Sequence, residues 1–391
     1  GFRPNHSTAT ALLNVTDDWL TSIDEGQIVC AVMLDLKKAF DTVDYVLLLR
    51  KLCMYGLDEP SQLWFSNYLH GRVQSTSVNG IMSDFLPVEC GIPQGSILGP
   101  LLFILHVNDL PRGLTHCKVS MYADDTVIYC SANDTIELSE KINEDLEYVK
   151  KWLIQNKLNL NIKKTEYIVF GTKQRLDKVK DNDLNITIDN TVLTRVSKCR
   201  HLGLILDERL SWQEHINTIH KKASNGLYML KSIRNIVNEY EMKLVYNSLV
   251  LSHLNYCDVV WGGCGSTQKN KLQKIQNRAA RIINRSSWYS SSDENLTRLN
   301  WNTLDNNRTK NVAIMMYKIV SKQAPEYLVE RFIFADHTYN TRSSLYNVKT
   351  IRPKTETMKR SFKYRGALTW NNLPHEVQGA KSLNIFKAKL T

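Results

Sequence analysis

Several features are missing from this sequence of 391 residues, and each absence excludes a class of protein. No apolar run approaches the roughly 18 residues that a membrane-spanning helix needs, and no basic segment followed by an apolar one opens the chain. No internal repeat and no low-complexity segment is present, so neither a repeat protein nor a disordered chain is expected. We therefore expect a folded intracellular protein, in the nucleus or the cytoplasm, that does not bind membranes.

The eight cysteines do not form a disulfide or zinc framework. They include no C-x-x-C pair and no tight repeated spacing, and several, such as Cys30 and Cys130, lie inside apolar runs. This pattern is typical of buried, reduced thiols in an intracellular protein. His253, Cys257 and Cys264 have the chemistry of zinc ligands, but a fourth partner is missing, so we expect no zinc site there.

Charge is distributed unevenly along the chain, although the net charge of +11 hides this. Residues 1–210 hold 22 Lys and Arg against 27 Asp and Glu, a net −5, whereas residues 211–391 hold 28 against 12, a net +16. An acidic half joined to a basic half suits a metal-dependent enzyme that acts on a polyanion, because the basic half can hold phosphates. A basic protein with no role in nucleic-acid binding explains the charge equally well.

Two adjacent carboxylates, Asp124 and Asp125, stand between short apolar runs at 119–122 and 126–129. The β-branched and aromatic residues in these runs favour strands, so we expect the pair in the tight connection of a hairpin. Two like charges there repel each other unless a cation or a cluster of donors faces them, which indicates a divalent metal with oxygen ligands. A solvated turn is the commoner role of an isolated Asp-Asp pair.

Other elements of the first half are predicted from local patterns. A helix is expected over 11–20, and the continuous apolar run 28–34 predicts a buried strand that ends at Asp35. Asn79-Gly80 predicts a hairpin turn, and the loop 91–100, rich in Gly and Pro, lets backbone approach a ligand closely. An amphipathic helix is expected after Asp134, which with Glu137 fits a capping box, and further strands at 167–170 and 201–206.

The second half is predicted to be mostly helical. Its most informative segment, 266–284, carries an apolar stripe (Leu272, Ile275, Ala279 and Ile282) beside a row of cations (Lys271, Lys274, Arg278, Arg281 and Arg285). A row of like charges repels itself, which indicates phosphates along it, the alternative being a solvated face. Residues 286–310 are rich in Ser and Asn and are expected to form a linker. The late tryptophans Trp288, Trp301 and Trp370 are assigned to packing.

Six segments, in this order and spacing, resemble the reverse transcriptases of non-LTR retrotransposons of the jockey type, a LINE-like group. They are Gly1-Phe-Arg-Pro with Ser7-Thr8, Leu34-Asp-Leu-Lys-Lys-Ala-Phe-Asp41, Gly91-Ile-Pro-Gln-Gly-Ser96 with Leu98-Gly-Pro100, Tyr122-Ala-Asp-Asp125, Leu158-Asn-Leu-Asn-x-x-Lys-Thr165 and His201-Leu-Gly-Leu204. The resemblance covers residues 1–206 well, and residues 207–391 resemble the thumb and C-terminal region of such elements on weaker grounds.

The resemblance implies an α+β fold, the right-hand polymerase, with an antiparallel palm sheet, packed helices and partial fingers, followed by a mainly α-helical thumb. The corresponding domains are fingers and palm at 1–206, a thumb-like region at 207–285 and a C-terminal basic helical region at 286–391. Because the sequence opens at Gly1 inside the family's pattern, we expect the upstream fingers and the endonuclease to be missing from it.

The implied activity is RNA-directed DNA polymerisation with two Mg²⁺ ions, Mn²⁺ being an alternative. Asp35 and Asp124 would bridge the ions, with Asp125 as the third acid. The implied partners are an RNA template, a DNA or RNA primer and dNTPs, without a membrane or an obligate protein partner. An alternative is a truncated remnant that binds nucleic acid without catalysis. A maturase-like splicing factor fits less well, because nothing resembles a splicing domain.

The resemblance also implies roles around the acids. Phe40 would exclude a ribose 2′-hydroxyl, although taken alone it fits the core better. Gln94 and Gly95 would support the templating base and the incoming nucleotide. Arg3 would hold the triphosphate, and Lys164 would act near the pyrophosphate as a general acid. Leu202 and Gly203 correspond to the primer grip.

Overall fold

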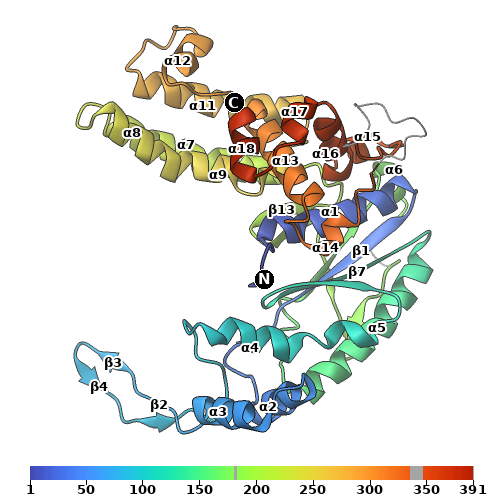
Figure 1. The fold of residues 1–391 in the computed structure, drawn as a ribbon. Coiled ribbons are helices and arrows are strands. Elements are labelled where there is room, and N and C mark those ends of the chain that lie inside the picture. The colour runs from blue at the N-terminus through green and yellow to red at the C-terminus, as the bar shows by residue number, and fades with distance from the viewer. Residues whose placement is uncertain (180–182, 335–346, 391) are drawn as a thin grey trace. The chain divides into compact units, whose positions relative to one another are not determined.

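The computed structural model describes residues 1–179, 183–334 and 347–390, which form two compact units (Figure 1). Unit 1 consists of Gly1–Arg3, Ile28–Val169 and Lys173–Val196, and unit 2 of Pro4–Gln27, Phe170–Thr172 and Ser197–Thr391. A small sheet and many helices confirm the predicted α+β class. The three-part division at residues 206 and 285 stays a prediction.

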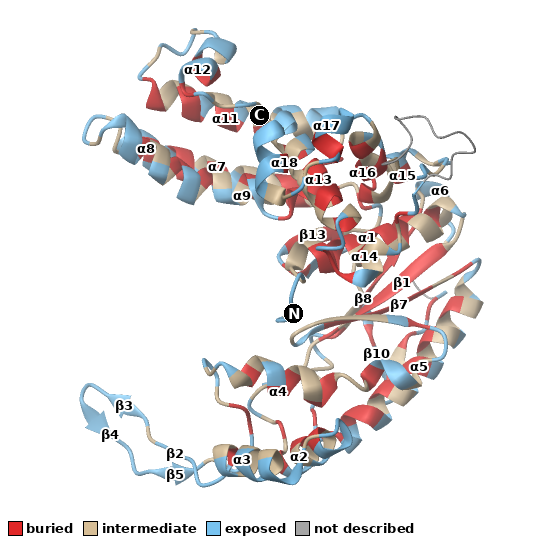
Figure 2. Ribbon diagram, viewed as in Figure 1, coloured by how far each residue is buried: buried red, intermediate tan, exposed pale blue. Residues whose placement is uncertain are grey.

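Unit 1 is built on a five-stranded sheet. The strand order is β11(Thr194–Arg195), β8(Glu166–Phe170), β1(Ile28–Leu34), β7(Asp125–Ala132) and β6(Lys118–Tyr122). β1, β7 and β6 are antiparallel neighbours, whereas β11 runs parallel to β8. All but one residue of β1 is buried, as Figure 2 shows, because a central strand covered on both faces needs apolar side chains throughout. The predicted strand that ends before Asp35 is confirmed.

Helix α5(Thr135–Gln155) packs against the sheet through β7. The predicted amphipathic helix is confirmed, because its buried residues include a stripe that recurs every three or four positions, Leu138, Ile142, Leu146, Val149 and Leu153. Asp134 caps the helix by accepting from the amides of Ile136 and Glu137. The expected capping box is half formed, because the Glu137 carboxylate binds Lys141 Nζ, at 2.6 Å, instead of returning to the cap.

The remaining elements of unit 1 are helices and short hairpins. The helices are α2(Tyr45–Met54), α3(Glu59–Leu69), α4(Leu98–Val107), the 3-10 helix η1(Leu110–Gly113) and α6(Lys173–Leu176). The hairpin pairs are β2(Val73–Gln74) with β5(Leu86–Pro87), β3(Ser77–Val78) with β4(Ile81–Met82), and β9(Thr187–Ile188) with β10(Thr191–Val192). The turn predicted at Asn79-Gly80 is confirmed, with φ of 51° and 83° as a type I′ turn requires.

Unit 2 is mainly helical, with one hairpin formed by β12(Lys198–His201) and β13(Leu204–Asp207). Its helices are α1(Thr8–Asp24), α7(Gln213–Ser232), α8(Glu239–Tyr246), the π-helix η2(Asn247–Leu251), α9(Ser252–Asn255), α10(Asp258–Trp261), α11(Ser266–Ile283), α12(Ser292–Arg298), α13(Leu304–Val320), α14(Glu326–Val329), α15(Glu356–Lys359), α16(Phe362–Asn371), α17(His375–Gln378) and α18(Leu383–Lys389). Among the described residues, no helix combines the length and the apolar character needed to cross a bilayer.

Three expectations in unit 2 are wrong. The strand expected at 201–206 is a hairpin, because residues 202 and 203 turn the chain back between β12 and β13. The linker expected at 286–310 contains α12 and the start of α13. Trp301 and Trp370 do pack, the first stacked on Tyr246 and the second fully buried, but Trp288 is 63% exposed.

Candidate active site

The acidic hairpin forms as the apolar runs predict. Tyr122 and Asp125 are register partners of β6 and β7, so Ala123 and Asp124 are a two-residue loop. Ala123 has a φ of 57°, whereas Asp124 is not among the residues of positive φ, the pattern of a type II′ hairpin turn. Positive φ costs an alanine about 1–2 kcal/mol, so the surrounding sheet must hold this turn in place. Asp124 and Asp125 are both exposed at its tip.

Asp35 is brought to this hairpin by strand pairing. Leu34 is the register partner of Thr126, so the next residues along the two antiparallel strands are Asp35 and Asp125. The backbone of Asp35 is also tied to the segment after α5. Its amide donates to Thr165 Oγ1, at 3.4 Å, and its carbonyl accepts from the amide of Asn161, at 2.7 Å. The acid at the end of β1 is therefore fixed from two sides.

The charges of Asp124 and Asp35 act electrostatically on the Asp125 carboxyl. The pKa of Asp125 is raised, first by desolvation and then by the negative charges of Asp124 and Asp35. No hydrogen bond or ion pair joins any of these three carboxylates to a described residue. Like charges placed near one another are electrostatically unfavourable, and a bound cation relieves this repulsion.

The donor set of the cluster is chemically suited to Mg²⁺ or Mn²⁺, because it offers carboxylate oxygens from two adjacent strands and no thiol or imidazole. It is not a closed cage. No group of three or more His, Cys, Asp or Glu side chains among the described residues is arranged to hold a metal ion. Mg²⁺ retains waters and takes phosphate oxygens as ligands in many enzymes, so one or two carboxylates per ion are sufficient.

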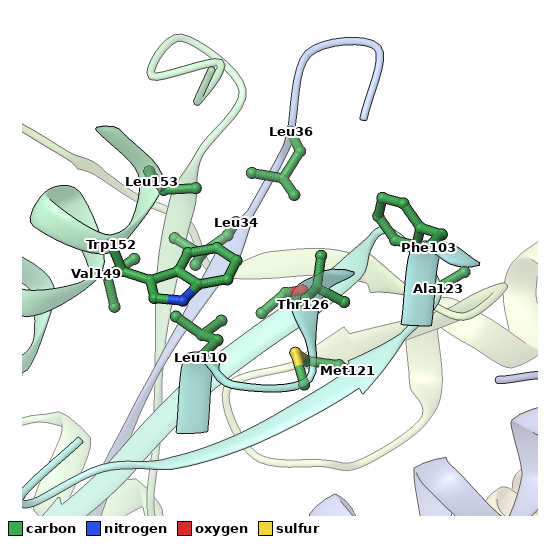
Figure 3. Close-up of a pocket in the computed structure, with 11 residues that line it drawn as sticks. Leu34, Leu36, Phe103, Leu110, Met121, Ala123, Thr126, Val149, Trp152 and Leu153 are labelled. Carbon is green, nitrogen blue, oxygen red and sulfur yellow. The ribbon is translucent and has the colours of Figure 1, made fainter. Parts of the chain in front are cut away.

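An apolar layer lies behind the acids. Leu34 and Leu36 line a cavity of about 10 Å³ together with Ala123 and Thr126 of the hairpin and Trp152 of α5 (Figure 3). A cavity of this size holds at most about one water molecule. Because side chains alternate along an extended chain, the flanking leucines point into this layer and Asp35 points away from it.

The loop after residue 90 is fastened to the segment after β1. Gly91 and Ile92 donate their amides to the carbonyls of Val43 and Phe40, each at 2.8 Å. Gln94 Nε2 donates to Asp41 Oδ1, at 2.8 Å, and Gly95 is exposed at a φ of 82°. The structure therefore holds the loop of the predicted Gln94 and Gly95 against the segment that follows β1 and Asp35.

Phe40 is a packing residue in this structure. Its half-buried ring stacks on the buried Phe103 of α4, with 4.2 Å between centroids and an interplanar angle of 21°. Stacking fixes one face of the ring against the core. A sugar-excluding role would use the remaining surface, so the two interpretations of Phe40 are compatible.

The two predicted cations of unit 1 are exposed. Arg3 donates from Nη2 to Asn108 Oδ1, at 2.7 Å, at the end of α4. Lys164 lies in the turn that holds Asp35, where its amide donates to the Asn161 carbonyl, and its side chain has no hydrogen-bond or ion-pair partner among the described residues. Asn161 and Thr165, for which no role was predicted, stand in the same segment as Lys164.

The predicted primer-grip residues lie in unit 2, at the turn between β12 and β13. Leu202 and Gly203 have φ of 44° and 82°, the signs of a type I′ turn. Leucine rarely adopts this conformation. Here the buried side chain and a hydrogen bond from Tyr256 Oη to the Leu202 carbonyl, at 3.0 Å, hold it. This tertiary support explains why the turn was not predicted.

The predicted cationic helix is confirmed as α11, with one change in its apolar face. Leu272, Ile275 and Ala279 are buried, but Ile283 completes this face and Ile282 is only half-buried. Two of the five cations donate to backbone carbonyls of the chain, and one of these, Arg285, lies just beyond the end of α11. Arg281 donates to the Ser290 carbonyl and Arg285 to the Val237 carbonyl, at 3.0–3.2 Å.

The other three cations differ in their contacts. Lys271 donates to Asn217 Oδ1, at 2.7 Å, and Arg278 lies over the Trp288 ring. Lys274 and Arg278 are exposed. These two therefore remain the clearest candidates for phosphate contacts.

The site thus consists of a hairpin of two strands that carries adjacent acids, with a third acid at the end of the neighbouring strand β1. Residues 1–206 match the family described as reverse transcriptase (RNA-dependent DNA polymerase), and the chain belongs to this family. This confirms the resemblance found in the sequence.

Curated relatives come from mobile elements. The RNA-directed DNA polymerase from mobile element jockey of Drosophila funebris is 26% identical over 299 residues, 74% of this chain and 32% of the relative. The probable RNA-directed DNA polymerase from transposon X-element of Drosophila melanogaster is 25% identical over 296 residues, with the same two coverages. The chain thus spans about a third of the length of the curated relatives it matches.

Solved structures with some similarity are telomerases. The structure from Candida albicans, in complex with a fragment of telomeric RNA, is 14% identical with a TM-score of 0.41, over 75% of this chain and 53% of that one. Apo telomerase from Candida tropicalis is 11% identical with a TM-score of 0.38, over 83% and 56%.

Proposed function

We propose that the chain is the polymerase module of a non-LTR retrotransposon and extends a primer 3′-hydroxyl with dNTPs on an RNA template. The observation that carries this proposal is the cluster of Asp35, Asp124 and Asp125 in a member of the reverse transcriptase family, in which the Asp125 pKa is raised and no described residue forms a hydrogen bond or ion pair with the three carboxylates. Such a cluster is most favourable when divalent cations and phosphates complete it.

In this proposal, Asp35 and Asp124 would hold the two Mg²⁺ ions and Asp125 would support them, with Mn²⁺ as an alternative ion. When bound, the ions lower the pKa of the primer hydroxyl and neutralise charge on the triphosphate. The primer oxygen then forms a bond to the α-phosphorus, the bond from that phosphorus to the pyrophosphate breaks, and the hydroxyl proton passes to solvent. Lys164, exposed in the turn that holds Asp35, donates a proton to the departing pyrophosphate.

The other residues of unit 1 bind and orient the nucleotide. Gln94 and Gly95 support the base pair from a loop that is hydrogen-bonded to the segment after Asp35. Phe40, held by its stack on Phe103, excludes a 2′-hydroxyl. Arg3 binds the triphosphate, for which it must leave or share its bond to Asn108.

In unit 2, the Leu202-Gly203 turn contacts the primer and the cations of α11 contact phosphates. An RNA template with a DNA or RNA primer fits the relatives' name, RNA-directed DNA polymerase. Action on nucleic acid in the nucleus, the cytoplasm or both is part of the proposal, and no obligate protein partner is required by it.

Primer extension tests this function. We expect dNTP- and Mg²⁺-dependent extension on an RNA template, and a loss of roughly 10²-fold or more in rate for Asp124→Asn, since metal-assisted charge stabilisation is worth several kcal/mol. Asp177→Asn is the matched control, because it removes an exposed acid outside the cluster, and it should keep wild-type activity. Equal extension by Asp124→Asn and the wild type would contradict the proposal.

A second candidate is a protein that binds nucleic acid without catalysis. The net +16 of residues 211–391 favours nucleic-acid binding whether or not the acids are active. This candidate predicts salt-dependent binding with a log-log slope of about −0.9 per phosphate contact on duplexes and no incorporation by any variant. The same extension assay separates the two candidates.

A further inference from the structure

Two neighbouring hollows follow the pair of helices α7 and α11, which pack along each other (Figure 1). The first, about 410 Å³, is lined by His220, Thr267, Asn270, Lys271, Lys274 and Arg278. The second, about 550 Å³, has Tyr228, Lys231, Arg234, Arg278, Arg281 and Trp288 among its lining. Arg278 lines both, so the hollows meet at its side chain. Neither hollow is lined by an Asp or a Glu.

The first hollow has the character of an anion site. Two cations, Lys271 and Arg278, add to desolvation in lowering the pKa of His220, which shows that positive charge is concentrated there. Like charges held together are unfavourable unless an anion joins them. Phosphate oxygens are the anions that lysine and arginine side chains bind most readily in nucleic acids.

The second hollow differs because it has aromatic side chains in its wall. Tyr228 of α7 is 76% exposed and Trp288, in the loop after α11, is 63% exposed. The guanidinium groups of Arg278 and Arg281 lie 5.6 and 5.8 Å from the centroid of the Trp288 ring. Both guanidinium groups lie over the ring and orient the indole, of which the larger part stays exposed. An oriented, exposed indole beside a second exposed ring is a surface on which flat groups can stack.

The loop that carries Trp288 is fastened at both ends. Arg281 donates to the Ser290 carbonyl and to Ser292 Oγ, at 2.8–3.1 Å. Asn295 binds Ser286 and Ser290 through its side chain, at 2.7 and 2.8 Å. A loop held this firmly orders the indole before any ligand arrives, which lowers the entropy lost on binding.

From this combination we infer that the α7–α11 groove, formed by the two hollows, binds unpaired nucleic acid. The phosphates would lie in the first hollow, against Lys271, Lys274 and Arg278, and a base would stack on Trp288 in the second. A duplex keeps its bases stacked on one another, so it cannot use the indole in this way, whereas a single strand can. This inference rests on the proposed nucleic-acid binding by α11 and specifies its ligand as a single strand.

Equilibrium binding to the full chain tests the inference. Fluorescence anisotropy would measure the affinity for labelled 12-nucleotide oligo(U) and oligo(dT) and for a blunt 12-base-pair duplex, without dNTPs. We expect Trp288→Ala to weaken binding of the single strands by about 5- to 140-fold, the range for loss of one stacked base, and to leave the duplex nearly unchanged. Comparison of oligo(U) with oligo(dT) identifies which sugar the groove prefers.

Matched variants keep the test specific. Trp64→Ala removes another exposed tryptophan, 54% exposed on α3, and should not change the affinity. Trp288→Phe keeps a ring and should restore most of the binding. Lys274→Gln and Arg278→Gln should each lower the log-log salt slope for the single strands by about 0.7, whereas Lys173→Gln, an exposed lysine on α6, should not.

Three outcomes would overturn the inference. If Trp288→Ala binds single strands with an affinity within twofold of the wild type, no base stacks on Trp288. If this variant loses equal affinity for single strand and duplex, the loss reflects general charge or folding effects instead of stacking. If the wild type binds an acidic peptide but no oligonucleotide, the groove is a protein site and the proposed function fails with it. Asp124→Asn should bind like the wild type, so a failure of catalysis is distinguishable from a failure of this groove.

Discussion

The negative charge of Asp35 acts on Asp125 across the pairing of β1 with β7 and helps to raise the pKa of the Asp125 carboxyl. The two residues are far apart in the sequence. Asp35 follows the buried strand β1, and Asp125 begins the largely buried strand β7. Their relationship links the fold to the proposed chemistry, because two carboxylates held against each other bind a cation more readily than either alone.

Substitution of Asp35 should therefore change the titration of Asp125. We expect Asp35→Asn to lower the Asp125 pKa, because one of the two charges that raise it is removed. Carboxyl ¹³C NMR titration measures this shift directly, and Mg²⁺ should lower the wild-type pKa in the same direction. An unchanged Asp125 pKa in the variant would show that the two carboxylates do not interact.

The loop that carries Gln94 offers a matched pair of glycines for a stability measurement. A Cβ on Gly91, at a φ of 91°, would lie 2.7 Å from the Asp41 carbonyl oxygen, whereas one on Gly95, at 82°, would meet nothing within 4 Å. Both alanine variants should lose about 1–2 kcal/mol for backbone strain, and Gly91→Ala roughly 1–3 kcal/mol more for the clash. Urea unfolding measures both, and equal losses would mean that the loop is not fastened as described.

Phe40→Val separates the packing role of Phe40 from its sugar-excluding role. We expect a loss of about 2 kcal/mol in stability, because the stack on Phe103 is lost, and roughly a 10-fold or larger fall in the preference for dNTP over rNTP. Phe65→Val, which shortens another half-buried ring, should lower stability without changing this preference. A stable enzyme with unchanged preference would leave Phe40 no role in sugar selection.

Acid should destabilise unit 2 through His201. Burial lowers its pKa to about 4 from an ordinary 6.5, so the unfolded chain binds a proton that the folded chain does not. Stability from this residue is present above pH 6.5 and is lost as the pH falls towards 4, by about 3 kcal/mol.

The measurement is urea unfolding between pH 8 and 4. His201→Leu should lose less stability than the wild type over this range, and His375→Leu, which removes an exposed histidine, should follow the wild-type curve. Parallel curves for the wild type and His201→Leu would contradict a buried, neutral His201.

Several features were predictable because they depend on neighbouring residues. The apolar run 28–34, the Asn79-Gly80 turn, the stripe of α5 and the cationic face of α11 follow from periodicity and turn chemistry, which act over a few residues. The turn at Leu202 and the exposure of Trp288 were missed for the opposite reason. Each is held by distant partners, Tyr256 for the first and Arg278 and Arg281 for the second.

By itself, the sequence determined several of the strands and helices, where the acids stand in them, and which family the chain resembles. Only the tertiary structure decided that Asp35 pairs across from Asp125, that the 91–95 loop is fastened to the strand exit, and that cations and an indole share one groove. Register and packing depend on hydrogen bonds and contacts between residues far apart in the chain, and no local pattern contains them.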